Sequence, residues 1–299
     1  MIKVNGVTKC FDTFKALVNL SLHVRKGTIY GLVGANGAGK TTVINHINGV
    51  LRSEEGEVFI NGEKVYENSD VKKTVLSIAD DWFYYATYTI KQMAKFYADI
   101  YPSFNYERYE KIKDVFSIDE KRQIRKLSKG MKKQVAFWLT LSCMPEVLIL
   151  DEPLDGLDPV MRKQVLSLVI QDVAEREMTV LVSSHNLREL EDICDWVGII
   201  HNGKMVAEKP LDDLKGNLHK YQMVIDEAGE EALRLEDAVV HISKTGSVYS
   251  VIVRGDISAV EEKLQRLSPK LCERVSLTLE EVFIYELGGL GYDCKNIII

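Results

Sequence analysis

No apolar run in this sequence of 299 residues approaches the roughly 20 residues that a helix needs to cross a bilayer. The first residues also lack the basic-then-apolar order of a signal peptide. The five cysteines are scattered and form no C-x-x-C pair, which disfavours a disulfide framework or a zinc site. We therefore expect reduced thiols in the cytosol, and we expect any membrane-crossing partner to be a separate chain.

The sequence also lacks the basic excess that is typical of nucleic-acid binding. The whole chain has 38 basic and 44 acidic residues, of which residues 211–299 hold 10 and 16, so residues 1–210 hold 28 of each. An acidic C-terminal part disfavours a nucleic-acid partner, and none is expected. There is no internal repeat, and the 46% of hydrophobic residues suffices for a large domain and a small one.

Strand and helix patterns alternate over the first 210 residues. Residues 28–33 are predicted to form a buried strand, and apolar residues at helical spacing predict a helix that begins near Lys40. Two further buried strands are predicted at residues 147–150 and 179–183. Strands that alternate with helices indicate a mostly parallel α/β sheet.

The pattern changes after Pro210. Short, half-exposed strands and an amphipathic helix at residues 256–267 predict a small α+β domain. We therefore expect a first domain over residues 1–212, with a helical subdomain at about 84–145, and an accessory domain over residues 213–299.

A Gly-rich segment follows the first buried strand and has the spacing G-x-x-x-x-G-K-[ST]. Glycines let the backbone turn so that successive N–H groups point at phosphate oxygens, and the following helix adds its N-terminal dipole. The Lys40 ammonium is expected to reach the β and γ phosphates, and the Thr41 hydroxyl to ligate Mg²⁺. The motif by itself indicates nucleotide binding. The predicted binding residues are Gly34, Ala35, Asn36, Gly37, Ala38, Gly39, Lys40, Thr41 and Thr42.

Two adjacent acids, Asp151 and Glu152, follow the apolar strand at residues 147–150. Because side chains alternate along a strand, these acids are expected to point in different directions and to have different roles. Asp151 is the candidate for holding Mg²⁺, and Glu152 is the candidate for polarising the attacking water. The alternative is a plain acidic strand-to-loop transition capped by Pro153, which the Gly-rich motif upstream disfavours.

Further motifs make the sequence resemble the nucleotide-binding domain of ABC transporters. Residues 127–131, Leu-Ser-Lys-Gly-Met, look like the family signature, with Lys129 where glycine is more common. Residues 154–159 resemble the D-loop, and His185 resembles the catalytic switch histidine. Phe11 matches the aromatic position that stacks on adenine, although it could also be a core residue. The chain as a whole is similar to bacterial ABC-2-type subunits of the YtrB-like or bacitracin-export-like kind.

The resemblance covers the first 210 residues and implies a P-loop NTPase cassette, with a mixed sheet core, an antiparallel β subdomain and a helical subdomain. It implies that two such domains pair head to tail, with each ATP between one P-loop and the partner's signature. Ser128, Lys129 and Gly130 would then act on the other subunit's ATP, and Ser128 can also cap its own helix. Asp158 would belong to the D-loop.

One position departs from the family pattern. The Q-loop of the family places a glutamine at the end of the strand that corresponds to residues 75–79, and here Asp80, Asp81 and Trp82 follow. By position Asp80 replaces the glutamine, although a shift of one residue in the alignment remains open. A carboxylate ligates Mg²⁺ more strongly than an amide does, so Asp80 is predicted as a further metal ligand and as a place where coupling to the membrane partner differs.

These features predict the ATP-hydrolysing motor subunit of an ABC transporter, and by resemblance an exporter. The expected ligands are ATP and Mg²⁺, and the expected partners are a second copy of the chain, or a related ATPase subunit, and a separate transmembrane permease. The chain is expected in the cytoplasm, peripheral on the inner face of the cell membrane. The aromatic segment at residues 82–90 is predicted to contact the permease, or alternatively to pack on its own domain.

The sequence disfavours two other functions. A soluble ABC ATPase acting on a macromolecular complex is disfavoured, because there is one cassette and there are no sustained heptads. A cassette that binds ATP without hydrolysis is disfavoured by the presence of Lys40, Asp151, Glu152 and His185.

Overall fold

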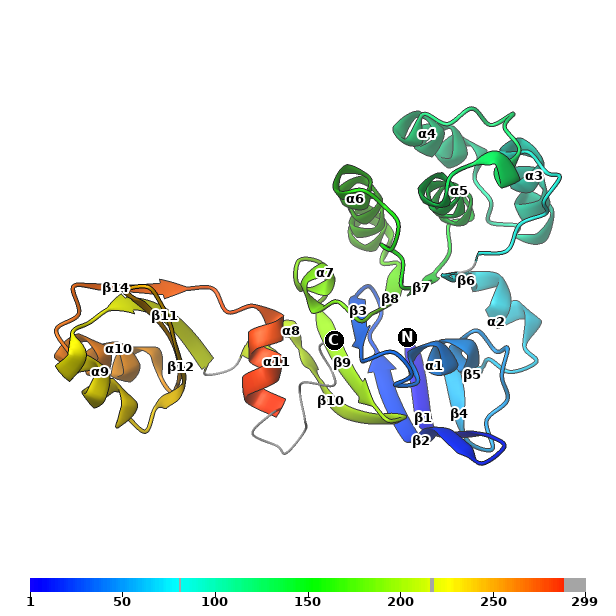
Figure 1. Cartoon of the computed structure of the whole chain (residues 1–299). Helices are drawn as coiled ribbons and strands as arrows, with labels where there is room; N and C mark the ends of the chain where they lie inside the picture. Colours follow the sequence, from blue (N-terminus) through cyan, green and yellow to red (C-terminus); the bar gives the residue numbers. More distant parts are fainter. Residues whose placement is uncertain (81, 216–217, 288–299) are drawn as a thin grey trace. The chain divides into compact units, whose positions relative to one another are not determined.

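The computed structural model describes residues 1–80, 82–215 and 218–287 and divides into two compact units (Figure 1). The first unit spans Met1–Lys209, and the second begins at Pro210. The boundary expected between residues 212 and 213 would cut helix α8 (Leu211–Lys215), whereas the observed division precedes that helix. Asp81 and Cys294 lie outside the described residues.

An antiparallel sheet opens the first unit. Strand β1 pairs with β2 on one side and with β4 on the other. Apolar side chains of β1, including Ile2, Val4 and Val7, are buried in the core, and the turn between β4 and β5 lies at Asn61 and Gly62. In sheet order the strands are β2 (Phe14–Val24), β1 (Ile2–Phe11), β4 (Glu55–Ile60) and β5 (Glu63–Lys64).

The central sheet of the first unit has six strands. Its strands from β9 through β6 in sheet order run parallel to their neighbours. Every residue of β3, β7 and β8 is buried, as expected for parallel strands that are covered on both faces. In sheet order the strands are β10 (Lys204–Pro210), β9 (Trp196–His201), β3 (Ile29–Val33), β8 (Thr179–Ser184), β7 (Val147–Asp151) and β6 (Val75–Ile78).

Helices of the first unit include a separate cluster formed by α3, α4 and α5 (Figure 1). In this cluster the Tyr109 ring stacks on the fully buried Trp138 ring at 4.7 Å between centroids. The break between α3 and α4 contains Pro102, which has no N–H for a helical hydrogen bond. The helices are α1 (Lys40–Ile47), α2 (Ser69–Thr74), α3 (Ile90–Ile100), α4 (Tyr106–Phe116), the 3₁₀ turn η1 (Ile124–Lys126), α5 (Lys129–Ser142), α6 (Pro159–Arg176) and α7 (Leu187–Glu191).

The second unit contains a β-α-β-β-α-β motif of the ferredoxin-like type. Its antiparallel sheet has the order β12-β13-β11-β14. Apolar side chains of the sheet, such as Met223 and Val251, form its core with Leu233 of α9 and Leu264 of α10. In chain order the elements are α8, β11 (Leu218–Val224), α9 (Glu227–Arg234), β12 (Val239–Thr245), β13 (Val248–Arg254), α10 (Ile257–Arg266), β14 (Leu271–Val275) and α11 (Leu279–Leu287).

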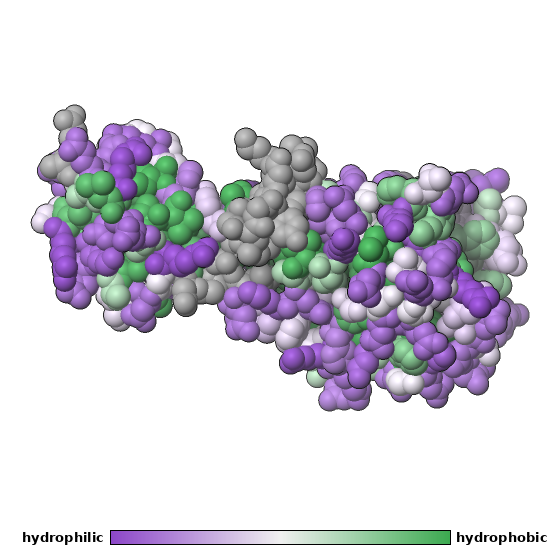
Figure 2. All heavy atoms as spheres, turned by 90° about the horizontal axis from the view of Figure 1, so that it is seen from below, coloured by the Kyte–Doolittle hydropathy of each residue, from purple (hydrophilic) through white to green (hydrophobic). Residues whose placement is uncertain are grey.

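The expected architecture is confirmed: a mixed α/β core with an antiparallel sheet and a helical cluster, followed by a small α+β unit. Within the described part of the chain, no helix combines the length and the apolar character that a membrane crossing requires. The face of the first unit that Figure 2 draws, on the right of the picture, is mainly hydrophilic with smaller apolar areas.

Candidate active site

Three neighbouring strands of the central sheet end at the same edge. Strands β3, β8 and β7 lie side by side and run parallel, so their carboxyl ends meet there (Figure 1). Strand β3 leads into the Gly-rich loop, β7 ends at Asp151, and His185 follows β8. Thr41 and Asp151, which are 110 positions apart in the chain, thereby come into contact.

Glycines in the loop meet two different requirements. A Cβ at Gly34 would lie 2.5 Å from the Ile200 carbonyl oxygen, so this position needs glycine for space. Gly39 has a φ of +112°, and a Cβ there would also lie 3.0 Å from the Ala16 carbonyl oxygen, so it needs glycine for conformation as well. Helix α1 begins directly afterwards at Lys40 without a side-chain cap, so its first N–H groups can bind an anion.

Lys40 points its ammonium at the loop rather than at solvent, and the residue is only 6% exposed. Its Nζ donates to the Gly34 carbonyl at 2.6 Å and lies 3.4 Å from both the Ala35 carbonyl and Glu152 Oε1. A phosphate oxygen can take the place of these carbonyl acceptors, because both are oxygen acceptors for the same ammonium.

Asp151 and Thr41 form a pair of oxygen donors beside the loop. The Thr41 hydroxyl donates to Asp151 Oδ2 at 2.9 Å, and the Ser183 hydroxyl donates to Asp151 Oδ1 at 2.5 Å. A hydroxyl and a carboxylate are ligands that Mg²⁺ prefers, and Mg²⁺ usually completes its shell with water and phosphate oxygens. No group of three or more His, Cys, Asp or Glu side chains that could hold a metal ion is found among the described residues. The donor set therefore fits Mg²⁺.

Glu152 lies just beyond β7 and has a φ of +48°, in the left-handed region. Its N–H lies 3.2 Å from both the carbonyl and the hydroxyl oxygen of Ser183, and its carbonyl accepts from Lys133 Nζ at 2.8 Å. The different environments of Asp151 and Glu152 therefore arise from this turn of the backbone rather than from strand alternation.

The Glu152 carboxylate faces two other site residues. Its Oε2 lies 2.9 Å from His185 Nδ1, and Oε1 faces the Lys40 ammonium at 3.4 Å without forming a hydrogen bond. A buried carboxylate oxygen without a hydrogen bond can accept one from a bound water. The structure thus brings Lys40, Glu152 and His185 together, as the chemistry predicted for them requires.

A pocket of about 290 Å³ lies over the Gly-rich loop. Phe11 lies at its rim and is 45% exposed, with Lys9 Nζ 5.5 Å from the ring centroid. Phe14, which pairs with Phe11 across the turn from β1 to β2, also lines the pocket and was not predicted. The spacing Phe-x-x-Phe across a two-residue turn is the sequence signal for it. The pocket is lined by Phe11, Phe14, Ala16, Ala35, Asn36, Gly37, Gly39, Lys40, Thr41, Thr42 and Glu152.

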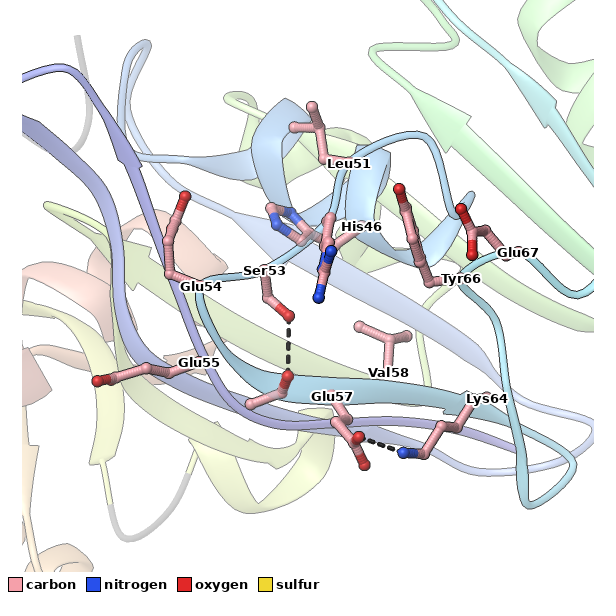
Figure 3. A pocket seen from close by; sticks show the side chains of 12 residues that line it. His46, Leu51, Ser53, Glu54, Glu55, Glu57, Val58, Lys64, Tyr66 and Glu67 are labelled. Carbon is pink, nitrogen blue, oxygen red and sulfur yellow. Dashed lines mark hydrogen bonds and ion pairs between the residues drawn. The ribbon is translucent and has the colours of Figure 1, made fainter.

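A larger pocket of about 520 Å³ includes His46, near the other end of α1 (Figure 3). Four glutamates line it against one arginine and one lysine, and Glu57 pairs with Lys64. Burial lowers the pKa of His46, so its ring adds no positive charge at neutral pH. A triphosphate would meet mainly carboxylates there, so we assign the nucleotide to the smaller pocket.

The signature residues lie at the start of α5. The Ser128 side chain caps this helix by accepting from the Met131 N–H at 3.2 Å, and Lys129 is the first helical residue. Gly130 packs closely on the D-loop, because a Cβ there would lie 2.9 Å from the Gly156 carbonyl oxygen. Asp158 caps α6, and its side chain accepts from two N–H groups at 3.0 Å. Roles of these residues in binding a partner's ATP stay predictions.

Asp80 has contacts of a different kind. Its Oδ1 lies 3.6 Å from Lys133 Nζ and 4.0 Å from Lys129 Nζ, both on α5. Asp151, in contrast, contacts Thr41 and Ser183. Asp80 as a magnesium ligand therefore stays a prediction.

Lys133 was not predicted as a functional residue. It is 4% exposed, and burial lowers the pKa of its ammonium, although Asp80 and Asp155 act in the opposite direction. A lysine on a helix that carries the signature suggests a solvated side chain, so the sequence alone did not single it out.

Comparisons with known proteins agree with this geometry. A family model described as ABC transporter matches residues 17–155. The chain is 32% identical to the ABC transporter ATP-binding protein YtrB of Bacillus subtilis (strain 168), over 97% of this chain and 99% of that protein. It is also 32% identical to the bacitracin transport ATP-binding protein BcrA of Bacillus licheniformis, over 97% and 98% of the two chains. A dimeric structure of the cassette MJ0796 bound to ADP and Pi has the same fold, with a TM-score of 0.63, 20% identity, and 71% and 99% of the two chains covered.

The two full-length relatives confirm the resemblance inferred from the motifs, including its YtrB-like or bacitracin-export-like form. The chain belongs to the family of ABC transporter ATP-binding proteins and is an ATPase of that family.

Proposed function

We propose that this chain is the motor subunit of an exporter, and that two ATPase subunits act as a head-to-tail dimer on a separate permease. The observation that carries the proposal is the convergence of Lys40, Glu152 and His185 beside the Thr41–Asp151 pair. This set provides a phosphate-binding cation, a base and a hydrogen-bonding histidine within one site.

In the proposed reaction, a water oxygen forms a bond to the γ phosphorus while the bond from that phosphorus to the bridging oxygen of ADP breaks. The Glu152 carboxylate accepts the proton of the water, and the Lys40 ammonium stabilises charge on the phosphate oxygens. His185 holds Glu152 in place through the 2.9 Å contact. Mg²⁺ bound through Thr41 and Asp151 would neutralise charge on the β and γ phosphates.

We propose a second subunit because the signature packs on its own D-loop, where Gly130 lies against Gly156, and not on its own phosphate loop. The start of α5 offers N–H groups to an anion from another chain. The dimeric cassette MJ0796 supports this arrangement by fold. We propose a second copy of this chain, or a related ATPase subunit, as the partner whose ATP meets Ser128, Lys129 and Gly130.

A permease contact is proposed for the aromatic segment after β6. Phe83 is 67% exposed and Tyr85 is 40% exposed, and their rings meet edge to face at 5.3 Å between centroids. Exposed aromatic clusters are enriched in protein interfaces. We propose export because one relative is named a bacitracin transport ATP-binding protein, and we propose that the chain lies on the inner face of the cell membrane.

Glu152→Gln tests the catalytic part of the proposal. We expect it to retain ATP binding, to lose turnover and to form a stable dimer with ATP in size-exclusion chromatography. If wild type hydrolyses ATP no faster than this variant, with or without a permease, the proposed motor function is wrong. Purification from native membranes in mild detergent tests the permease, because recovery of no membrane protein would contradict that part.

A further inference from the structure

We infer that Lys133 is a positioning residue that links the signature helix to the backbone of Glu152, with Asp80 as its counter-ion. The inference rests on the catalytic role proposed for Glu152. Lys133 Nζ donates to the Glu152 carbonyl at 2.8 Å and lies 3.6 Å from Asp80 Oδ1. At 4% exposed, this ammonium is enclosed by protein groups rather than solvated.

Glu152 needs fixing from outside because its backbone is in the left-handed region, which is unfavourable for residues with a Cβ. Its N–H is held by Ser183 on β8, and its carbonyl is held by Lys133 on α5. The two contacts restrain the peptide groups on both sides of the Glu152 Cα. They thereby set the direction of the side chain that meets His185.

Lys133 also couples the position of the signature to that of Glu152. Helix α5 begins at Lys129, and Lys133 follows one turn later on the same rigid element. A displacement of the capped end at Ser128 would therefore move the Lys133 ammonium and the Glu152 carbonyl with it. Asp80, just beyond β6, adds a third segment to the same contact. One ammonium thus joins the signature helix, the end of β7 and the end of β6.

Asp80 then has a role that differs from metal binding. A buried ammonium requires a compensating charge, and Asp80 Oδ1 is the carboxylate oxygen that forms an ion pair with it in the described part of the chain. The same carboxylate lies 4.0 Å from Lys129. A carboxylate that faces two ammonium groups is less available to Mg²⁺, because those cations compete for its oxygens.

The test compares four variants of the full-length chain: Lys133→Met, Lys133→Gln, Asp80→Asn and, as the matched control, Lys132→Met. The control removes the same charge from the same helix, where Lys132 Nζ lies 5.1 Å from the Tyr84 ring centroid instead of at Glu152. The measurements are kcat, KM for ATP, binding of a fluorescent ATP analogue, and the Mg²⁺ concentration that gives half-maximal rate.

We expect Lys133→Met to lower kcat by about 10- to 100-fold, because a misplaced catalytic group costs this much, while analogue binding stays within about threefold. Lys133→Gln, which retains an N–H donor for the Glu152 carbonyl, should recover part of the lost kcat. Asp80→Asn should lower kcat without raising the Mg²⁺ requirement. Lys132→Met should match wild type.

A normal kcat in Lys133→Met would overturn the inference, as would a parallel loss of analogue binding and kcat, which marks a merely structural residue. If Lys133→Met does not fold, the test rests on Lys133→Gln and Asp80→Asn. A wild-type kcat in both of these variants would then overturn the proposal. A raised Mg²⁺ requirement with normal kcat in Asp80→Asn would make Asp80 a metal ligand instead. These results are separable from failure of the proposed function, which requires that Glu152→Gln remain active.

Discussion

Replacement of Ser183 by alanine should damage the site by removing one oxygen atom. Ser183 is fully buried, and its hydroxyl donates to Asp151 Oδ1 at 2.5 Å. A hydrogen bond to a charged group contributes about 1.5–3 kcal/mol to stability. At about 2–4 °C per kcal/mol for a unit of this size, the midpoint of thermal unfolding should fall by about 3–12 °C.

Ser142→Ala is the matched control for that measurement. Its hydroxyl is also fully buried, but it donates at 2.6 Å to a neutral acceptor, the Trp138 carbonyl. A hydrogen bond between neutral groups contributes about 0.5–1.5 kcal/mol, so this variant should lose less stability than Ser183→Ala. The three tryptophans all lie in the first unit, so their fluorescence reports on its unfolding.

Activity provides the second measurement on the same pair. Loss of an outer partner of a metal ligand typically costs about 10–100-fold in metal affinity or activity, so Ser183→Ala should require at least about tenfold more Mg²⁺. Ser142→Ala should keep the wild-type requirement. If Ser183→Ala destabilises the first unit no more than Ser142→Ala and leaves the Mg²⁺ dependence unchanged, the prediction that Ser183 orients Asp151 is wrong.

Three further outcomes are expected. Gly39→Ala should abolish binding of a fluorescent ATP analogue, because its φ of +112° and the 3.0 Å approach to the Ala16 carbonyl leave no relaxed position for a Cβ; normal binding in equilibrium titration would contradict this. Phe14→Ala should weaken adenine-nucleotide binding by about 1–3 kcal/mol if it stacks on the base, and a matching series with a triphosphate that lacks a base should show no loss. The lowered pKa of His46 makes its neutral form part of the folded state, so its contribution is complete above the unfolded value of 6.5 and is lost as pH falls through the lower folded value. Urea unfolding followed by tryptophan fluorescence should therefore show less loss of stability in His46→Gln than in wild type between pH 7 and 5.

Much of the site could be predicted from the sequence because the residues concerned are close together in the chain. The motif from Gly34 to Thr41 includes the loop, the start of α1 and Lys40. One motif therefore predicts that Lys40 contacts the loop. Asp151 and Glu152, at the end of β7, could likewise be located from the apolar strand before them. These predictions depend on neighbours in the chain, which a sequence displays directly.

Other contacts depend on the order of strands in the sheet, which the sequence does not display. Ser183 reaches Asp151 because β8 lies beside β7, and nothing in the local pattern of β8 distinguishes this hydroxyl from a structural one. In the second unit, β14 is a mostly exposed edge strand without apolar alternation, and α9 has only eight residues. Both elements form through packing on strands that are distant in sequence, so periodicity alone did not predict them.

Two departures from the family pattern, Asp80 and Lys129, were found separately in the sequence and lie 4.0 Å apart in the structure. Asp80 and Lys129 carry opposite charges and form an exposed ion pair. Their direct contribution should be small, because both side chains are more than half exposed and such pairs contribute about 0–1 kcal/mol. Lys133 is different, since its ammonium is buried, and Asp80 and the Glu152 carbonyl replace part of the solvation that it loses. Asp80 therefore contributes to stability mainly through its ion pair with Lys133. The Lys129 ammonium can leave Asp80 for another anion at little cost in free energy.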